Sequence, residues 1–152
     1  MSDARYLAPG WFTRHVFNRT VAGLTRLGIS VYGSRVLVVR GRTSGLPREV
    51  PVNLLMYDGN RYLVAPRGTT QWVRNLRTAG EGELRLGRRA EPFSATEVAE
   101  DEKVPILRHY LEKWAWEVGA FFDGVDAKAS DDELRRIGPD HPIFALSPRQ
   151  AK

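Results

Sequence analysis

The stretch of sequence that most constrains the fold is residues 36–56, which reads as a strand, a loop and a second strand. Residues 35–40 are largely β-branched and apolar, as expected of a buried strand. Two glycines and Pro47 in residues 41–48 favour a turn over a helix. Apolar and polar residues then alternate over residues 49–57, which indicates a second strand. This alternation predicts one buried face, made of Val50, Val52, Leu54 and Met56.

The loop at residues 41–48 carries the groups that bind an anionic, phosphate-bearing ligand. Arg42 and Arg48 supply guanidinium donors, and Thr43 and Ser44 supply hydroxyls. A turn also leaves backbone N–H groups available to an anion. The same residue types are common in solvated hairpin loops, so the loop by itself admits both interpretations.

The overall charge narrows the class of ligand. A chain of 152 residues with 42% hydrophobic content is long enough for one sizeable core. Its net charge of +5 is compatible with a nucleic acid, a membrane surface or an acidic small ligand. Because the basic residues are scattered singly and in pairs, we expect a local anion site and no nucleic-acid partner.

Several other classes of site are excluded or disfavoured by composition. The chain contains no cysteine, which excludes disulfides and thiolate nucleophiles. Its three histidines, His15, His109 and His141, are far apart in sequence, so we expect no metal site. Neither a signal peptide nor a long apolar span is recognisable, and we expect a cytoplasmic protein.

The first 30 residues predict an amphipathic helix, which we treat as a segment separate from a barrel domain at residues 31–152. Apolar residues recur at spacings of three and four from Trp11 to Leu27, and Arg14, Arg19 and Arg26 lie on the other face. Such a helix can pack on a sheet or lie on an anionic membrane surface, as peripheral membrane contact would require.

The remaining chain alternates hairpins with helices. Asp58-Gly59 is typical of a tight hairpin turn. Thr70 is a suitable N-cap, and Ser130 with Glu133 forms a capping-box pattern. The further predicted strands are residues 61–65, 83–86, 91–98 and 141–146, and the helices are 71–77, 101–118 and 130–138. About six mostly antiparallel strands with helices outside predict a mainly β (α+β) fold, a small β-barrel.

The motifs in this order resemble the deazaflavin-dependent nitroreductase family of actinobacteria. The resemblance rests on the loop at residues 41–48, Arg67-Gly68, Trp72-Val73-Arg74-Asn75-Leu76 and the final Pro142-Ile143-Phe144. It implies a split β-barrel of the FMN-binding-like type and the use of reduced coenzyme F420 as a hydride donor. The resemblance is clearest over residues 35–86.

The same resemblance implies roles for particular residues. The loop with Arg42, Thr43, Ser44 and Arg48 would hold the phosphate and the acidic oligoglutamate tail of F420. The ring would be bordered by Pro51, Val52, Asn53, Leu54, Ala65, Pro66, Arg67 and Gly68. Behind this site would stand Trp72, Asn75 and Arg77.

Two departures from the family concern the substrate side. Pro66 stands where the family tends to have Ser, and Arg67 where it commonly has Lys, in a shorter loop. The family's substrate-facing tyrosines have no clear counterpart here. Trp114, Trp116, Phe121 and Phe122 occupy that region instead. We interpret Trp114 as core, whereas Trp116 and Phe121 fit either core or substrate contact.

The expected reaction is hydride transfer from C5 of the reduced deazaflavin to a quinone, enone or nitro acceptor. The sequence names no catalytic acid; Ser44, a hydroxyl of Thr69 or Thr70, or a water would supply the proton. The alternatives are an FMN-binding split-barrel oxidoreductase and a non-catalytic deazaflavin-binding protein. Both a monomer and a homodimer are compatible with the sequence.

Overall fold

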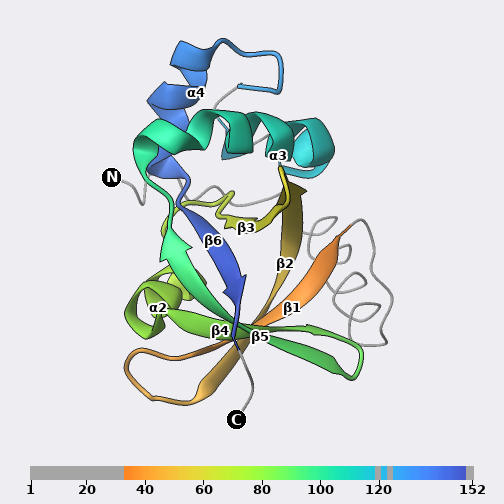
Figure 1. Ribbon diagram of the computed structural model, residues 1–152. Helices are drawn as coiled ribbons and strands as arrows, with labels where there is room; N and C mark the ends of the chain where they lie inside the picture. The colour runs from red at the N-terminus through yellow and green to blue at the C-terminus, as the bar shows by residue number, and fades with distance from the viewer. Residues whose placement is uncertain (1–32, 119–120, 123–124, 150–152) are drawn as a thin grey trace, which may run out of the picture.

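Six antiparallel strands form a closed barrel in the computed structural model, which describes residues 33–118, 121–122 and 125–149 (Figure 1). Around the barrel the strand order is β1-β2-β3-β6-β5-β4. The strands are β1 (Ser34–Arg40), β2 (Pro47–Tyr57), β3 (Asn60–Val64), β4 (Glu81–Leu86), β5 (Arg89–Glu97) and β6 (Ile143–Pro148). The predicted six-stranded, mostly antiparallel barrel is therefore confirmed. The helix predicted within residues 1–30, with its two alternative roles, lies outside the described residues.

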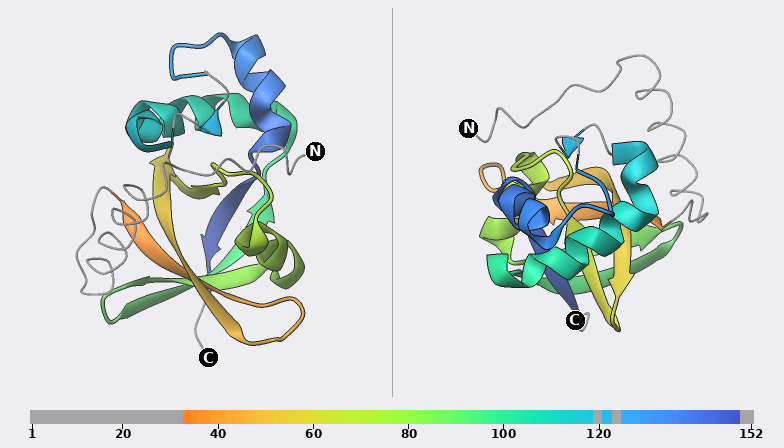
Figure 2. Two further views of the ribbon diagram at one scale, coloured as in Figure 1. Left: turned by 180° about the vertical axis from the view of Figure 1, so that it is seen from behind. Right: turned by 90° about the horizontal axis from the view of Figure 1, so that it is seen from above.

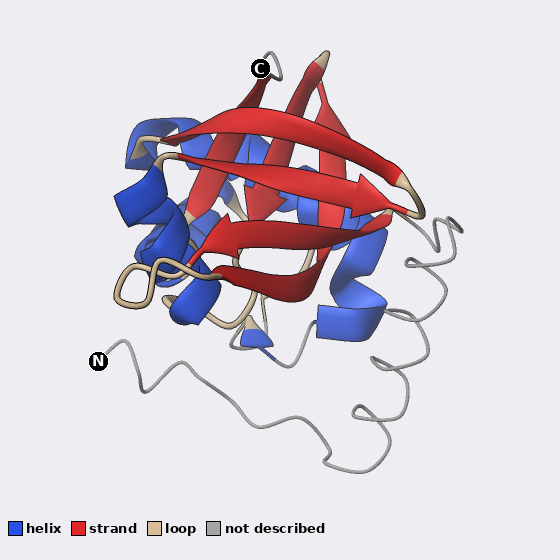
Figure 3. Cartoon of the chain, turned by 90° about the horizontal axis from the view of Figure 1, so that it is seen from below, coloured by secondary structure: helices blue, strands red, loops and turns tan. Residues whose placement is uncertain are grey.

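The helices lie on the outside of the barrel. Seen from above, α3 (Lys103–Val118) and α4 (Asp131–Ile137) cross one end of it, and the view from below shows the strands of the other end (Figures 2 and 3). The short α2 (Gln71–Ala79) packs beside β1 and β4. Two 3₁₀ turns, η2 (Glu100–Glu102) and η4 (Gly138–Asp140), flank α3 and β6. No helix within the described ranges is long and apolar enough to cross a membrane.

Strand β2 changes partner halfway along its length, and this creates an open edge. Its first part pairs with β1, from Pro47 to Asn53, whereas residues 54–57 pair with β3. Because the N–H of Leu54 donates to the carbonyl of Gly33 at 2.9 Å, the alternation of an antiparallel ladder turns the backbone of Asn53 and Pro51 away from β1. On that side β3 pairs with residues 54–57, and among the described residues no strand pairs with residues 47–52 there.

The hydrophobic core has two parts that share the barrel wall. One fills the barrel interior and includes Leu37, Leu54, Leu63, Leu84, Phe93 and Phe144. The other lies between the wall and the α3–α4 layer and includes Leu55, Tyr110, Leu111, Trp114, Phe122 and Ile143. Burying a large apolar side chain contributes about 1.5–3 kcal/mol relative to leaving it exposed. The predicted core position of Trp114 is confirmed, since its side chain is completely buried.

The prediction of a single buried face on β2 is wrong near the end of the strand. Met56 is 52% exposed although it lies on the same face as Leu54, because it pairs with Arg61 beside the exposed turn that ends the β2–β3 hairpin. Leu55, on the opposite face, is fully buried because it packs in the core cluster beneath α3. Val50 and Val52 pack against the barrel interior but are only partly buried.

The predicted hairpin turn and capping box are confirmed, whereas the predicted N-cap at Thr70 and the start of the last strand are only partly so. Asp58 and Gly59 have φ angles of 52° and 79°, as the predicted hairpin turn requires, and the Ser130 capping box is present. Thr70 is the N-cap of α2, but its side chain makes no capping hydrogen bond. The last strand begins at Ile143 and not at His141, which is the C-cap of η4.

Candidate active site

The basic loop between β1 and β2 is held in one shape by its own hydrogen bonds. Gly41 N donates to Leu46 O at 2.8 Å, and Gly45 N donates to Gly41 O at 2.9 Å. The hydroxyl of Ser44 accepts a bond from Leu46 N at 3.1 Å. Arg40 adds a bond from its guanidinium to Gly45 O at 2.7 Å. The loop is therefore a defined turn, and its exposed basic side chains start from a fixed backbone.

Arg42 is fixed in place by Asn75 of α2. The Oδ1 atom of Asn75 accepts hydrogen bonds from the backbone N–H of Arg42 at 3.0 Å and from its guanidinium at 2.8 Å. Asn75 is 6% exposed, so water competes little for these bonds. The contact joins the basic loop to α2, two parts of the predicted site that lie far apart in sequence.

Ser44 and Arg48 approach the same point on the loop, at Gly41. A Cβ atom on Gly41 would lie 2.9 Å from Ser44 Oγ and 3.4 Å from Arg48 Nε. A side chain at Gly41 would force the Ser44 hydroxyl to move. Arg42, Thr43, Ser44 and Arg48 are all exposed, so the loop presents two guanidinium groups and two hydroxyls to solvent. Planar guanidinium groups of this kind suit phosphate and carboxylate oxygens.

The loop after β3 forms a second compact turn. Ala65 N donates to Pro142 O at 2.9 Å, Gly68 N to Ala65 O at 3.3 Å and Thr70 N to Gly68 O at 2.9 Å. Gly68 has a φ of +86°, a conformation that glycine adopts without strain. Ala65 and Gly68 are buried, whereas Pro66 and Arg67 are half-buried.

The Thr70 hydroxyl is the group of this turn that is suited to bind a ligand. Its Oγ1 atom is buried and has no hydrogen-bond partner within the described part of the chain. A buried polar atom left unsatisfied costs about 1–3 kcal/mol. A polar atom of a bound molecule would remove that cost, so this hydroxyl fits a site that a ligand completes.

In the predicted ring-binding segment of β2, the side chains and the backbone face different surroundings. The side chain of Leu54 belongs to the barrel core, and that of Val52 packs against it. A ligand at the open edge would therefore meet the backbone of Pro51. Proline lacks an N–H, so only its carbonyl is available at that position.

On α2, Trp72 and Arg77 face different neighbours. Trp72 is half-buried, with its ring centroid 6.1 Å from that of Phe144. Arg77 forms a two-pronged ion pair with Glu97 of β5, at 2.8 and 2.7 Å. The hydrogen bonds from Arg77 lower the pKa of Glu97 below its ordinary value. The pair ties the end of α2 to the barrel.

The predicted catalytic and substrate-facing residues divide between the site and the core. Ser44 is in the basic loop, and Thr69 is half-buried beside Thr70. Phe121 is 3% exposed and packs in the core cluster, with the Arg67 guanidinium 5.1 Å from its ring centroid. Trp116 lies on α3, but its side chain is outside the described part of the structure.

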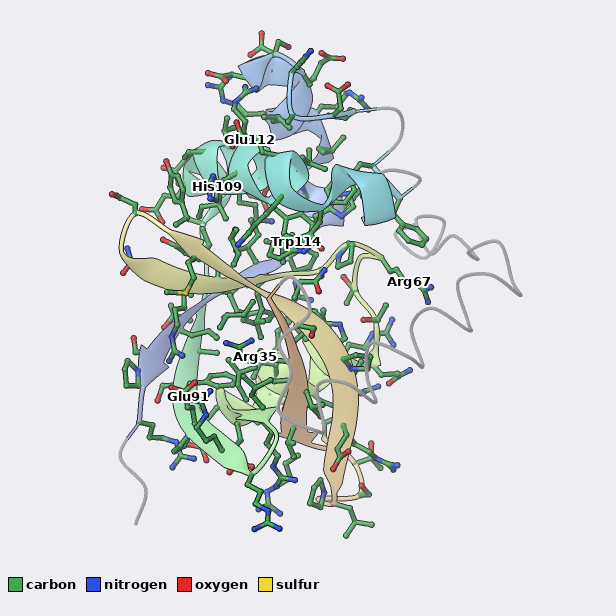
Figure 4. All side chains as sticks on the ribbon, turned by 90° about the vertical axis from the view of Figure 1, so that its right-hand side faces the viewer. Arg35, Arg67, Glu91, His109, Glu112 and Trp114 are labelled. Atoms are coloured by element: carbon green, nitrogen blue, oxygen red, sulfur yellow. The ribbon has the colours of Figure 1, made fainter. Side chains whose placement is uncertain are left out.

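Arginines elsewhere on the barrel have structural partners. Arg35 donates to Ser34 O at 2.8 Å, and Arg61 lies 3.3 Å from a carboxylate oxygen of Glu91. Burial lowers the pKa of Arg35. Figure 4 shows Arg35 and Glu91 on one side of the view and Arg67 on the other. No group of acidic, histidine or cysteine side chains suited to a metal ion occurs among the described residues.

Sequence reasoning missed one residue that contacts the second loop. The Nδ1 atom of His141 lies 3.0 Å from the carbonyl oxygen of Ala65, 76 residues earlier in the chain. No local pattern marks this contact, because it depends on the pairing of β3 with β6.

A closed antiparallel barrel of six strands with helices outside it is the fold of the split-barrel class of proteins. A family model described as F420H(2)-dependent quinone reductase matches residues 12–126. The match covers most of the sequence, so the chain belongs to this family, in which reduced F420 is the hydride donor and a quinone the acceptor. A search of curated proteins gives no significant match.

Solved structures support the fold. A chain described as a domain-swapped dimer has a TM-score of 0.57 and 16% identity over 90% of this chain and 97% of its own. The F420-H2-dependent reductase FDR-A has a TM-score of 0.51 and 18% identity, covering 76% and 94%. HutZ, a heme storage protein from Vibrio cholerae, has a TM-score of 0.51 and 12% identity, covering 88% and 90%. Because proteins with such different ligands share the barrel, the fold by itself does not select the cofactor.

Proposed function

We propose that this protein binds reduced F420 and uses it to reduce quinones, with enones and nitro compounds as further acceptors. The observation that carries the proposal is the contact between Asn75 and Arg42, which holds a two-arginine loop next to α2. F420 has a phosphate and an acidic tail, and such a loop provides the matching positive charge.

The anionic part of F420 would be held by Arg42, Ser44 and Arg48. Arg42 is already oriented by Asn75, so little side-chain entropy is lost when its remaining N–H groups bind a phosphate. Ser44 uses its oxygen to accept a bond from Leu46 N and keeps its own hydrogen to donate. Arg48 is exposed on β2 and suits the acidic tail.

The ring would lie along the open edge of β2, against the loop after β3. The carbonyl of Pro51 faces that edge, and the Thr70 hydroxyl supplies a buried polar atom. Contact with the strand and the loop would keep water away from the covered part of the ring. When bound, the reduced deazaflavin supplies the hydride from its C5.

The protein must also deliver a proton, because a quinone that accepts a hydride becomes a hydroquinone only after it is protonated. The hydroxyls of Ser44, Thr69 and Thr70 are the groups of the site that can pass a proton, directly or through a water. Orientation and exclusion of water are the remaining contributions of the chain.

The test is a fluorescence titration of the purified protein with F420, with Arg42→Ala and Arg48→Ala alongside it. Loss of a charge-assisted hydrogen bond costs about 1.5–3 kcal/mol, so we expect affinity to fall roughly tenfold or more in each variant. Arg88→Ala, in the exposed turn between β4 and β5, removes the same charge far from the site and should bind as the wild type does.

Three results would change the assignment. Tight binding of FMN with no binding of F420 would place the protein among the FMN-binding split barrels. Binding of F420H2 without oxidation by menadione or another quinone would indicate a non-catalytic deazaflavin-binding protein. Equal loss of affinity in all three arginine variants would show a general effect of net charge and not a phosphate loop.

A further inference from the structure

His141 lies in the buried space between the α3–α4 layer and the loop after β3. It is 0% exposed, and its ring stacks on Phe122 with centroids 4.0 Å apart and planes 9° from parallel. Its Nδ1 atom is 3.0 Å from the carbonyl oxygen of Ala65. A carbonyl can only accept, so Nδ1 carries the hydrogen and donates it.

The neighbouring Pro142 also forms a hydrogen bond with Ala65. Ala65 N donates to Pro142 O at 2.9 Å, while Ala65 O accepts from His141 and from Gly68 N. Both backbone groups of Ala65 are therefore bonded to the segment that leads into β6. Gly68 in turn holds Thr70 through the bond from Thr70 N to Gly68 O.

The backbone of His141 is itself fixed by a buried lysine. Lys103 is 2% exposed, and its Nζ atom donates to Glu100 at 2.7 Å, to Gly138 O at 2.8 Å and to His141 O at 3.3 Å. A buried ammonium with three oxygen acceptors is fully satisfied. The backbone of His141 is therefore fixed, and its imidazole is a well-positioned donor to the carbonyl of Ala65.

We infer that His141 is a positioning residue for the cofactor loop at residues 65–70, acting through its hydrogen bond to Ala65 O. This inference rests on the proposed function, since that loop is the one we place against the deazaflavin ring. Two backbone hydrogen bonds, from Gly68 N to Ala65 O and from Thr70 N to Gly68 O, connect Ala65 with Thr70. A shift at Ala65 therefore displaces the Thr70 hydroxyl that would meet the ring. The imidazole itself does not contact the reacting atoms.

Two substitutions separate the hydrogen bond from the ring stack. His141→Phe keeps a flat ring on Phe122 but removes the donor to Ala65 O. His141→Asn removes the stack but places an amide N–H at the same number of bonds from the backbone as Nδ1. Leu134→Ala is the matched control, because Leu134 is fully buried in the same core cluster and lies on α4.

The first readout is amide hydrogen exchange of the ligand-free full-length protein. The N–H groups of Gly68 and Thr70 should exchange about tenfold faster in His141→Phe, as expected for the loss of one hydrogen bond worth about 1.4 kcal/mol. In His141→Asn and Leu134→Ala they should exchange close to the wild-type rate. This measurement needs no cofactor, so it stands even if the protein does not bind F420.

The second readout is the Kd for F420. His141→Phe should bind about tenfold more weakly, and His141→Asn should recover most of that loss, whereas Leu134→Ala should bind normally below its melting temperature. If exchange in His141→Phe rises evenly over α3 and the loop, or if His141→Phe matches Leu134→Ala in both readouts, His141 is only a core residue and the inference fails. Absence of F420 binding in the wild type would instead refute the proposed function.

Discussion

Asn75 Oδ1 accepts two hydrogen bonds from a single residue, Arg42, one from its backbone N–H and one from its guanidinium. The two residues are separated by 33 positions, and Asn75 is nearly buried. One amide oxygen thus fixes both the turn of the basic loop and the direction of its first arginine. This dual contact explains why a helix interior carries asparagine, a residue that is unfavourable there by propensity.

Replacing Asn75 with alanine should weaken F420 binding more than it weakens the fold. The change leaves the backbone N–H of Arg42 without its acceptor and releases the guanidinium, at a cost of about 1–3 kcal/mol. We expect roughly a tenfold rise in the Kd for F420, measured by fluorescence titration. Asn60→Ala, at the exposed first residue of β3, is the control. Wild-type affinity in Asn75→Ala would show that the contact plays no part in binding.

The ion pair between Arg77 and Glu97 predicts a pH-dependent contribution to stability. The pKa of Glu97 is lower in the folded protein than in the unfolded chain, chiefly because of the hydrogen bonds from Arg77. The stabilisation is therefore present above the unfolded pKa of about 4.3 and is lost as pH falls through the lowered folded pKa. Both side chains are more than a third exposed, so the effect at neutral pH should be under about 1 kcal/mol.

Glu97→Gln tests this by urea unfolding at pH 7 and at pH 3. The variant should be less stable than the wild type at pH 7, and the difference should shrink at pH 3, which lies below the ordinary pKa of a glutamate in the unfolded chain. Glu102→Gln, on an exposed 3₁₀ turn, serves as the comparison. A difference that stays constant between the two pH values would contradict the assignment.

At Gly33, just before β1, there is no room for a side chain next to the helical layer. Its φ is +90°, and a Cβ there would lie 3.1 Å from the ring of Trp114 and 3.2 Å from Leu54 O. Gly33→Ala therefore combines backbone strain with crowding against a fully buried indole. Gly59→Ala is matched in φ, at +79°, but has open space around it. We expect the former to lower the unfolding free energy by about 1–3 kcal/mol more, in parallel urea melts.

Strands and turns were predictable because their causes are local. The β-branched run before Gly41, the Asp58-Gly59 turn and the Ser130 cap each act within a few residues, and all occur in the structure. Burial of Leu55 and exposure of Met56 were not predictable in this way. They depend on where α3 covers the barrel wall and where the β2–β3 hairpin ends, which the alternation within β2 does not encode.

The site shows the same division. The basic loop was recognisable from its residue types, and resemblance to a family pointed to Asn75. The contact of His141 with Ala65 was missed because the two residues are 76 positions apart and meet only through the pairing of β3 with β6. From the sequence, His141 is considered only as a possible metal ligand. No local feature of the sequence indicates that its side chain binds a backbone carbonyl.

Gly41 offers the sharpest test of the loop geometry. An alanine Cβ there would lie 2.9 Å from Ser44 Oγ, so the hydroxyl must move and release Leu46 N. Gly41→Ala should therefore weaken F420 binding severalfold, with only a small change in melting temperature, because the side chain that must move belongs to the exposed Ser44.

The double variant identifies the cause of that loss. In Ser44→Ala the hydroxyl is absent, so adding Gly41→Ala no longer forces it to move. If crowding against Ser44 is responsible, the double variant should bind F420 about as well as Ser44→Ala alone, and the two effects should be non-additive. Arg48 Nε is the next atom at 3.4 Å, a contact that a flexible side chain can relieve. Simple addition of the two single losses would show that Gly41→Ala acts through the backbone or through Arg48, and the proposed convergence of Ser44 on Gly41 would be rejected.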